Sequence, residues 1–188
     1  MLVLIAGLVV FFGVHSVRMA AGGFREAQIA ANPGRWRAVY SLASLAGFAL
    51  IIWGWALFRP EAPEVYQAPA WGRHAASALV LVAFILLVAS SLPAGYLKRW
   101  VKHPMLAGVI LWAIGHLLAN GDLASVLLFG SFLAYSLVNR VAVISRGDPT
   151  TAVIQPRSDY IAIGVGIVAF AVFALWLHGW LFGVQPFG

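Results

Sequence analysis

The chain has 188 residues, of which 62% are hydrophobic and only 10% are charged, and its formal net charge is +6. Soluble domains carry about 25% charged residues, so this composition indicates an integral membrane protein with a single domain over residues 1–188. The chain contains no cysteine, which excludes disulfides, iron–sulfur clusters and thiol catalysis. Because the basic residues lie in short segments between apolar stretches, we assign the positive charge to membrane orientation and expect no nucleic-acid partner.

Six apolar stretches approach the length of about 20 residues that a helix needs to cross a bilayer. In chain order they are Leu2–Val17, Trp36–Phe58, His74–Leu92, Pro104–Ala119, Leu123–Val138 and Tyr160–Gly183. The fourth and fifth are short, so we expect them to tilt or to run partly along the membrane interface. The sequence therefore predicts an all-α fold, a polytopic bundle of about six transmembrane helices.

The basic residues between these stretches predict the orientation of the chain. Ten of the twelve lie in or at the edge of the segments after the first, third and fifth stretches, whereas only Arg59 and Arg73 lie on the opposite side. By the positive-inside rule, those three segments are cytoplasmic and both termini lie outside. No basic residue precedes the first stretch, so we expect an uncleaved membrane anchor rather than a signal peptide.

The five histidines are the side chains best suited to binding a metal. His15 and His116 lie well inside predicted spans, where an ionisable residue is a functional candidate. His103 begins the fourth span, where it serves as a helix-start residue, a metal ligand or a proton-transfer group. His74 and His178 lie near the predicted outer interface, where histidine costs little, so we expect an ordinary interfacial role for both.

Two histidines on different helices suit the iron of a haem that is held without a covalent bond. A zinc site would need at least a third ligand, and these spans carry no further histidine or carboxylate for it. At 1.5 Å per residue, the predicted depths of His15 and His116 differ by roughly 10 to 15 Å, so this pair requires a tilt or a haem standing along the membrane normal. His103 lies nearer to His15 in predicted depth, and the pair of His15 with His103 remains the alternative.

Neighbouring side chains would complete such a haem site. Trp112, one helical turn before His116, could pack against the porphyrin. Three arginines on the predicted cytoplasmic side could pair with the haem propionates: Arg18, Arg35 and Arg37.

Two other features are explained by structure rather than by chemistry. The segment 120–122, with the sequence Asn-Gly-Asp, fits a turn followed by a helix-capping aspartate. Three pairs of glycines within the spans are typical of closely packed membrane helices: Gly7 and Gly13, Gly47 and Gly54, and Gly164 and Gly166.

Three segments of the sequence resemble the NnrU family. They are F-F-G-V-H-S-V-R at residues 11–18, G-R-W-R-A-V-Y-S-L-A-S at 34–44 and H-P-M-L-A-G-V-I-L-W-A-I-G-H-L-L-A-N-G-D at 103–122. The NnrU family comprises small bacterial inner-membrane proteins associated with nitrite and nitric oxide metabolism. It is similar to the plant zeta-carotene isomerase, an integral membrane haem-b protein that isomerises a cis double bond in a polyene.

The resemblance implies roles for individual residues. His15 and His116 sit where the isomerase has its haem-ligand histidines, and His103 matches the histidine of its His-Pro pair. Ala113 stands where the isomerase has a cysteine, so we do not expect an exchange of iron ligand to a thiolate.

The resemblance implies a multi-pass protein of the bacterial inner membrane that binds haem b. Its partners would be the lipid bilayer and either a small nitrogen oxide or a hydrophobic polyene; a homo-oligomer is left open. If the protein is an enzyme, it is then a haem-dependent redox protein or isomerase. One alternative is a non-catalytic assembly or accessory factor for denitrification enzymes, because no recognisable catalytic set is visible. A weaker alternative is a membrane methyltransferase, which the His-Pro start faintly resembles.

Overall fold

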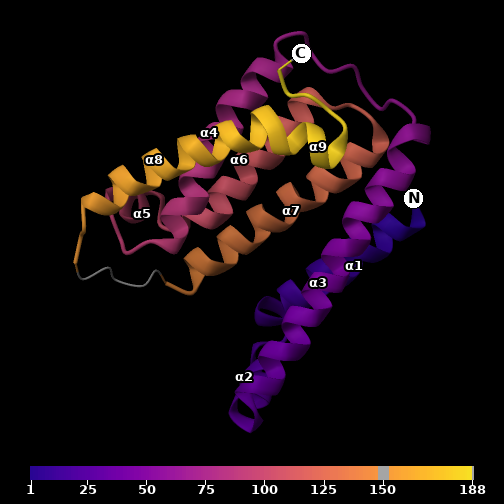
Figure 1. Cartoon of the computed structure of the whole chain (residues 1–188). Helices are drawn as coiled ribbons and strands as arrows, with labels where there is room; N and C mark the ends of the chain where they lie inside the picture. Colours follow the sequence, from indigo (N-terminus) through magenta and orange to yellow (C-terminus); the bar gives the residue numbers. More distant parts are fainter. Residues whose placement is uncertain (148–152, 188) are drawn as a thin grey trace. The chain divides into compact units, whose positions relative to one another are not determined.

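The computed structural model describes residues 1–147 and 153–187. Within these ranges the regular structure is helical, apart from one isolated antiparallel bridge between Glu64 and Asp122. The chain forms two compact units (Figure 1). Unit 1 contains Met1–Val65 and Asp122–Ser131, and unit 2 contains Tyr66–Gly121 and Phe132–Gly188. The prediction of an all-α fold is confirmed, whereas the single domain over residues 1–188 stays a prediction.

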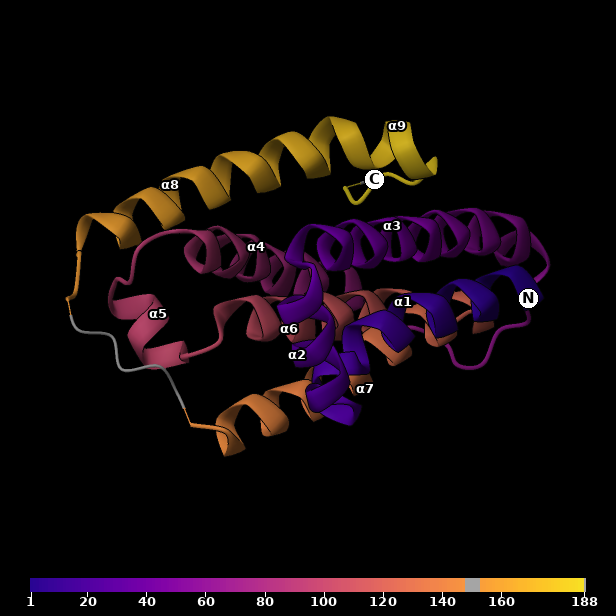
Figure 2. The same cartoon turned by 90° about the horizontal axis from the view of Figure 1, so that it is seen from below.

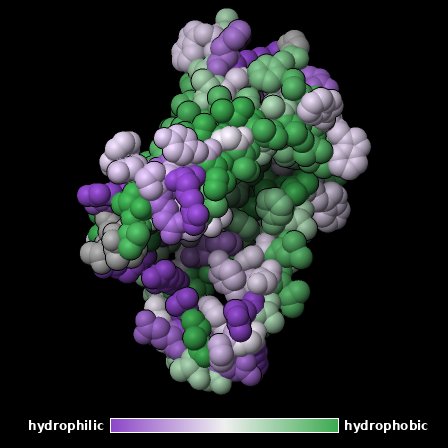
Figure 3. All heavy atoms as spheres, turned by 60° about the vertical axis from the view of Figure 1, so that its left-hand side comes forward, coloured by the Kyte–Doolittle hydropathy of each residue, from purple (hydrophilic) through white to green (hydrophobic). Residues whose placement is uncertain are grey.

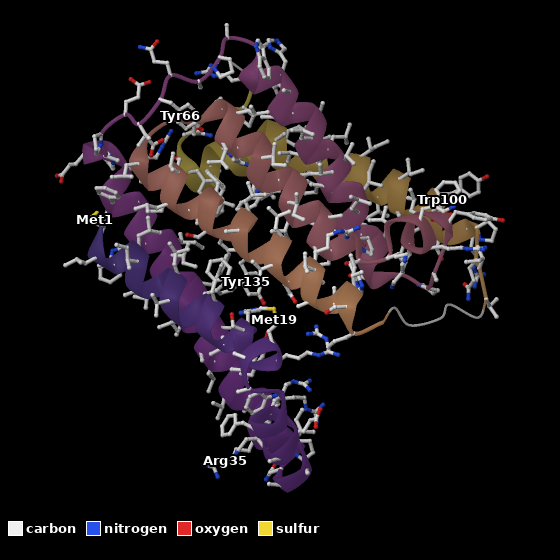
Figure 4. The ribbon with its side chains drawn as sticks, turned by 180° about the vertical axis from the view of Figure 1, so that it is seen from behind. Met1, Met19, Arg35, Tyr66, Trp100 and Tyr135 are labelled. Carbon is white, nitrogen blue, oxygen red and sulfur yellow. The ribbon has the colours of Figure 1, made fainter. Side chains whose placement is uncertain are left out.

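Unit 1 is built on two long antiparallel helices, α1 (Leu2–Ala20) and α3 (Pro33–Phe58), which lie side by side (Figure 2). A short helix that the sequence did not predict, α2 (Gly22–Ala31), connects them. Met1 and Arg35 lie at opposite ends of this unit (Figure 4). The start of α3 is fixed locally, because the Asn32 side chain accepts a hydrogen bond from the Arg35 backbone at 2.9 Å and Pro33 occupies the first turn.

Glycines bring the backbones of α1 and α3 into contact. A Cβ atom at Gly7 would lie 2.6 Å from the backbone nitrogen of Ile51, and one at Gly47 would lie 2.8 Å from that of Phe11. At Gly54 the added atom would overlap the backbone of Leu4. Small residues allow this close approach, on which helix packing in membranes depends.

Unit 2 is arranged around α4 (Gly72–Ser91), which packs against α6 (Pro104–Ala119) and α8 (Arg157–Val172). A Cβ atom at Gly166 of α8 would lie 2.7 Å from the Cα atom of Ile85, so this helix also approaches α4 closely. The helical path of α8 continues through the π-helical turn Phe173–Leu177 into α9 (His178–Phe182).

A second unpredicted helix, α5 (Tyr96–Val101), follows α4 and precedes α6 along the chain. Its first backbone N–H groups, those of Tyr96 and Leu97, donate to the carboxylate of Asp159 at 2.7 and 3.1 Å. Asp159 belongs to the first turn of α8. A carboxylate at a helix N-terminus satisfies amides that have no partner within the helix and interacts favourably with the helix dipole.

Two basic side chains stabilise the other helix ends of this region. Lys98 donates to the backbone carbonyls of Ser90 and Leu92, both at 2.9 Å. Arg140 donates to the backbone carbonyls of Val101 at 3.1 Å and His103 at 3.4 Å. These residues of the predicted cytoplasmic segments therefore hold helix ends in place, in addition to any part in orientation.

Among the described residues, five helical segments are long and apolar enough to cross a membrane, and α6 is a shorter apolar helix. The fifth span, α7 (Leu123–Ser145), is longer than the predicted Leu123–Val138, so the expectation that this span is short was wrong. It begins in unit 1 and continues in unit 2. On the face that Figure 3 shows, hydrophobic side chains form broad continuous areas, and hydrophilic side chains gather in separate groups. The multi-pass membrane prediction is thereby supported.

Candidate functional site

His15 lies on α1 in unit 1, and its ring is oriented by a backbone hydrogen bond. Its Nδ1 atom lies 2.7 Å from the carbonyl oxygen of Phe11. Because a carbonyl only accepts, Nδ1 donates its proton, and in the neutral ring the lone pair is on Nε2. The ring stacks on Phe11 with centroids 4.2 Å apart and lies 5.4 Å from the ring of Tyr40. His15 is thus held in the tautomer that binds a metal through Nε2.

A cavity of about 340 Å³ lies between α1, α2 and α3, next to this histidine. Tyr40, which contacts the His15 ring, also lines the cavity, as does Arg35. Of the other two arginines predicted to bind propionates, Arg37 donates to the Pro33 carbonyl at 3.3 Å, and Arg18 lies in the last turn of α1. The remaining lining residues are Val14, Val17, Phe24, Gln28, Ala31, Asn32, Trp36 and Val39.

His116 lies on α6 in unit 2 and is oriented in the same manner. Its Nδ1 atom donates to the carbonyl oxygen of Trp112 at 2.8 Å, again placing the lone pair of the neutral ring on Nε2. The ring centroids of Trp112 and His116 are 5.0 Å apart. Trp112 is held in turn by an edge-to-face contact with Phe132 at 5.4 Å. Trp112 therefore lies beside the His116 ring, and its packing against a porphyrin stays a prediction.

His178, which the sequence analysis treated as an ordinary interfacial residue, lies beside His116. The two ring centroids are 6.5 Å apart, and the ring planes differ by 20°. The Nδ1 atom of His178 donates to the carbonyl oxygen of Val184 at 2.7 Å. A signal for this pair was present in the sequence, because both residues lie late in spans that cross the membrane in the same direction.

His103 stands directly before Pro104 at the start of α6, and its carbonyl accepts a hydrogen bond from Arg140. Thirteen positions along the chain separate it from His116, which corresponds to roughly 20 Å, so these two cannot bind one metal ion. The pairs of His15 with His116 and of His15 with His103 stay predictions, because each joins unit 1 to unit 2. Over residues 1–147 and 153–187, no three His, Cys, Asp or Glu side chains gather as a metal site.

The turn at residues 120–122 is explained by packing. A Cβ atom at Gly121 would overlap the backbone oxygen of Tyr66. The Tyr66 hydroxyl donates to the carbonyls of Leu117 and Asn120, the latter at 2.9 Å. Figure 4 shows Tyr66 at the end of unit 2 opposite to Trp100. This tyrosine therefore holds the end of α6 that carries His116.

Asp122 acts as the helix cap that the sequence predicted. Its Oδ1 atom accepts a hydrogen bond from the backbone N–H of Ser125 at 2.8 Å, in the first turn of α7. Its Oδ2 atom lies 4.0 Å from Nε of Arg59. These contacts give Asp122 a structural role within unit 1.

Comparison with known families decides the classification. The model of the NnrU protein family matches residues 3–186. The chain belongs to the NnrU family. The match covers nearly the whole of this NnrU-family protein. At the level of the family, it supports the interpretation of the chain as a membrane protein related to nitrogen-oxide metabolism. No curated protein and no solved structure matches the chain.

Proposed function

We propose that this NnrU-family protein of the bacterial inner membrane binds haem b, that His15 and His116 would hold it, and that the protein uses it in the redox chemistry of nitrogen oxides. The observation that carries the proposal is the hydrogen bond from Nδ1 of each histidine to a carbonyl one turn earlier. Histidines that bind metals almost always donate their other ring N–H to such an acceptor, which sets the tautomer and the ring orientation.

The residues present suit a haem. Imidazole nitrogen is a common axial donor to haem iron, and aromatic rings lie against both candidate ligands, Phe11 at His15 and Trp112 at His116. Arg35, at the cavity of unit 1, offers a cation for a propionate. Bound haem would supply an iron that exchanges one electron and binds a small nitrogen oxide.

The chain's own residues would set the conditions for that chemistry. The carbonyls of Phe11 and Trp112 keep the proton on Nδ1, so that Nε2 of each ring would be the donor atom to a bound metal. These rings lie on apolar helices, and an apolar surrounding would raise the effect of every nearby charge on a bound iron. An ionisable residue in such a setting is costly unless it has a function.

An absorption spectrum of the detergent-purified protein tests the proposal. After haem is supplied, we expect a b-type spectrum in the oxidised and dithionite-reduced forms and a pyridine haemochrome of about one haem per chain. Nitric oxide should shift the bands of the reduced form. The replacement His116→Ala should lower the haem content or change the spectrum, whereas the matched control His74→Ala, at an exposed position on α4, should not.

Three results would contradict this proposal in different ways. A protein that stays colourless after haem is supplied would refute haem binding altogether. A protein that keeps haem with an unchanged spectrum in both His15→Ala and His116→Ala would refute the ligands. If reduced protein isomerised a cis polyene and did not react with nitric oxide, the substrate class would be a polyene instead.

A further inference from the structure

We infer that α5 and the start of α8 form a binding surface for a phospholipid with a net negative headgroup. We call it the α5 surface and define it by five exposed side chains at one end of unit 2: Tyr96, Arg99, Trp100, Arg157 and Tyr160. None of these residues is a proposed haem ligand, so lipid binding here is independent of the proposed function.

The two faces of α5 have different surroundings. Tyr96, Arg99 and Trp100 are three and four positions apart, so they share one face of the helix, and all three are exposed. Lys98 lies on the opposite face and donates to two carbonyls at the end of α4, both at 2.9 Å. The helix is therefore held to unit 2 by one face, and its aromatic and basic face is left for another partner.

The start of α8 is joined to this helix by hydrogen bonds. The carboxylate of Asp159 accepts from the first two backbone N–H groups of α5, at 2.7 and 3.1 Å. The backbone N–H of Gln155 donates to the carbonyl of Ala94 at 2.8 Å, directly before α5. Arg157 lies between these two anchoring residues in the sequence, so its exposed side chain belongs to the same end of unit 2.

The exposed aromatic rings indicate where this surface lies in the membrane. The rings of Tyr96 and Trp100 are 5.8 Å apart, and these residues are 42% and 74% exposed. Tyr160, in the first turn of α8, is 77% exposed. Tyrosine and tryptophan are enriched at the boundary between bilayer and water. Since α4 ends and α6 and α8 begin beside α5, the surface fits the layer of lipid headgroups (Figure 4 shows Trp100 at this end).

The charge of the surface selects the kind of headgroup. Arg99, Lys102 and Arg157 are exposed cations, whereas Asp159 is the one acidic residue in segments 91–102 and 155–160. Basic side chains at the predicted cytoplasmic side attract anionic lipids. The positive-inside rule accounts for these charges, but it requires no helix that presents two rings beside an arginine. Cations next to interfacial rings match a phosphate headgroup above the start of its acyl chains.

Phosphatidylglycerol with brominated acyl chains tests the inference, because bromine quenches tryptophan fluorescence on contact. The protein is purified in a neutral detergent and titrated, and the signal of Trp100 is the difference between each protein and its Trp100→Phe counterpart. We expect Arg99→Gln to raise the half-quenching concentration about fivefold, and the double variant with Arg157→Gln to raise it about 25-fold. Brominated phosphatidylcholine should bind more weakly and respond little to these replacements.

Arg146→Gln is the matched control, because it removes an exposed cation of unit 2 that follows α7. It should leave the half-quenching concentration at the wild-type value. An equal effect of Arg146→Gln and Arg99→Gln would show attraction to the overall charge and overturn a defined surface, as would wild-type binding by the double variant. The wild type alone gives a further check, since salt should weaken its binding of phosphatidylglycerol. Binding that does not change with salt would also overturn the inference.

Discussion

Replacing Gly47 by alanine should weaken the packing of α1 on α3. Gly47 is buried, and an added Cβ atom would lie 2.8 Å from the backbone nitrogen of Phe11 and 3.0 Å from its Cα and Cβ atoms. Ordinary contacts of a Cβ atom begin at 3.4 Å. Because the atoms in the way belong largely to backbone, the helices must separate by some tenths of an ångström.

The expected cost follows from two opposing effects. Overpacking of a closely packed contact typically costs about 1–3 kcal/mol, and separated helices also lose dispersion contacts along the interface. Alanine gains about 1 kcal/mol over glycine in helix propensity. Gly13 on α1 is a matched control, since no described atom lies within 4 Å of a Cβ atom built there. The propensity gain is common to both variants, so their unfolding free energies should differ by about 1–3 kcal/mol.

The assay is unfolding of the purified protein in mixed micelles, titrated with sodium dodecyl sulfate and followed by far-ultraviolet circular dichroism. Gly54→Ala should be at least as destabilising as Gly47→Ala, because its Cβ atom would overlap the backbone of Leu4. Equal unfolding free energies for Gly47→Ala and Gly13→Ala would refute the reasoning that backbone contact requires glycine at this position.

The same titration checks two further predictions. Asp159→Ala should lower the unfolding free energy by about 1–2 kcal/mol, because two N–H groups at the start of α5 lose a charged acceptor. The stability of Asp159→Asn should fall between those of Asp159→Ala and the wild type. Wild-type stability in both variants would contradict the capping role of Asp159. Gly121→Ala should lower the unfolding free energy by about 1–3 kcal/mol, because the added Cβ atom would overlap the Tyr66 backbone. The control Gly130→Ala should cause no such loss, because no described atom lies within 4 Å of a Cβ atom built there. Similar unfolding free energies for the two variants would argue against a close contact at Gly121.

Where local chemistry sets a helix boundary, the prediction from sequence agreed with the structure. The fourth span was predicted as Pro104–Ala119, and α6 has these ends, because proline suits a first turn and the following Asn-Gly cannot easily extend a helix. The cap at Asp122 was also predicted, since the donor it needs lies three residues away. The fifth span was predicted too short, because its last turns carry polar residues such as Asn139 and Arg140.

Two short helices could not be predicted from their own residues. Both α2 and α5 are too short to form in isolation, since helix nucleation is costly. The start of α5 depends on Asp159, which lies more than sixty positions further along the chain. The role of individual glycines could not be predicted from the sequence either. Gly7 and Gly166 lie against a neighbouring backbone, whereas no described atom lies close to a Cβ atom built at Gly13 or Gly164. The sequence does not distinguish these two kinds of glycine.

The sequence by itself determined the membrane class, the six apolar stretches and the family, because these depend on composition, on the length of apolar runs and on motifs read along the chain. Only the tertiary structure decided that His178 lies beside His116 and that each ring donates its Nδ1 proton to a carbonyl. The physical reason is the distance along the chain over which each feature is determined. An apolar run or a helix cap depends on neighbours within a few positions. A pair of side chains 62 positions apart is set by the close packing of α4 with α6 and α8, and by the turns that orient each ring.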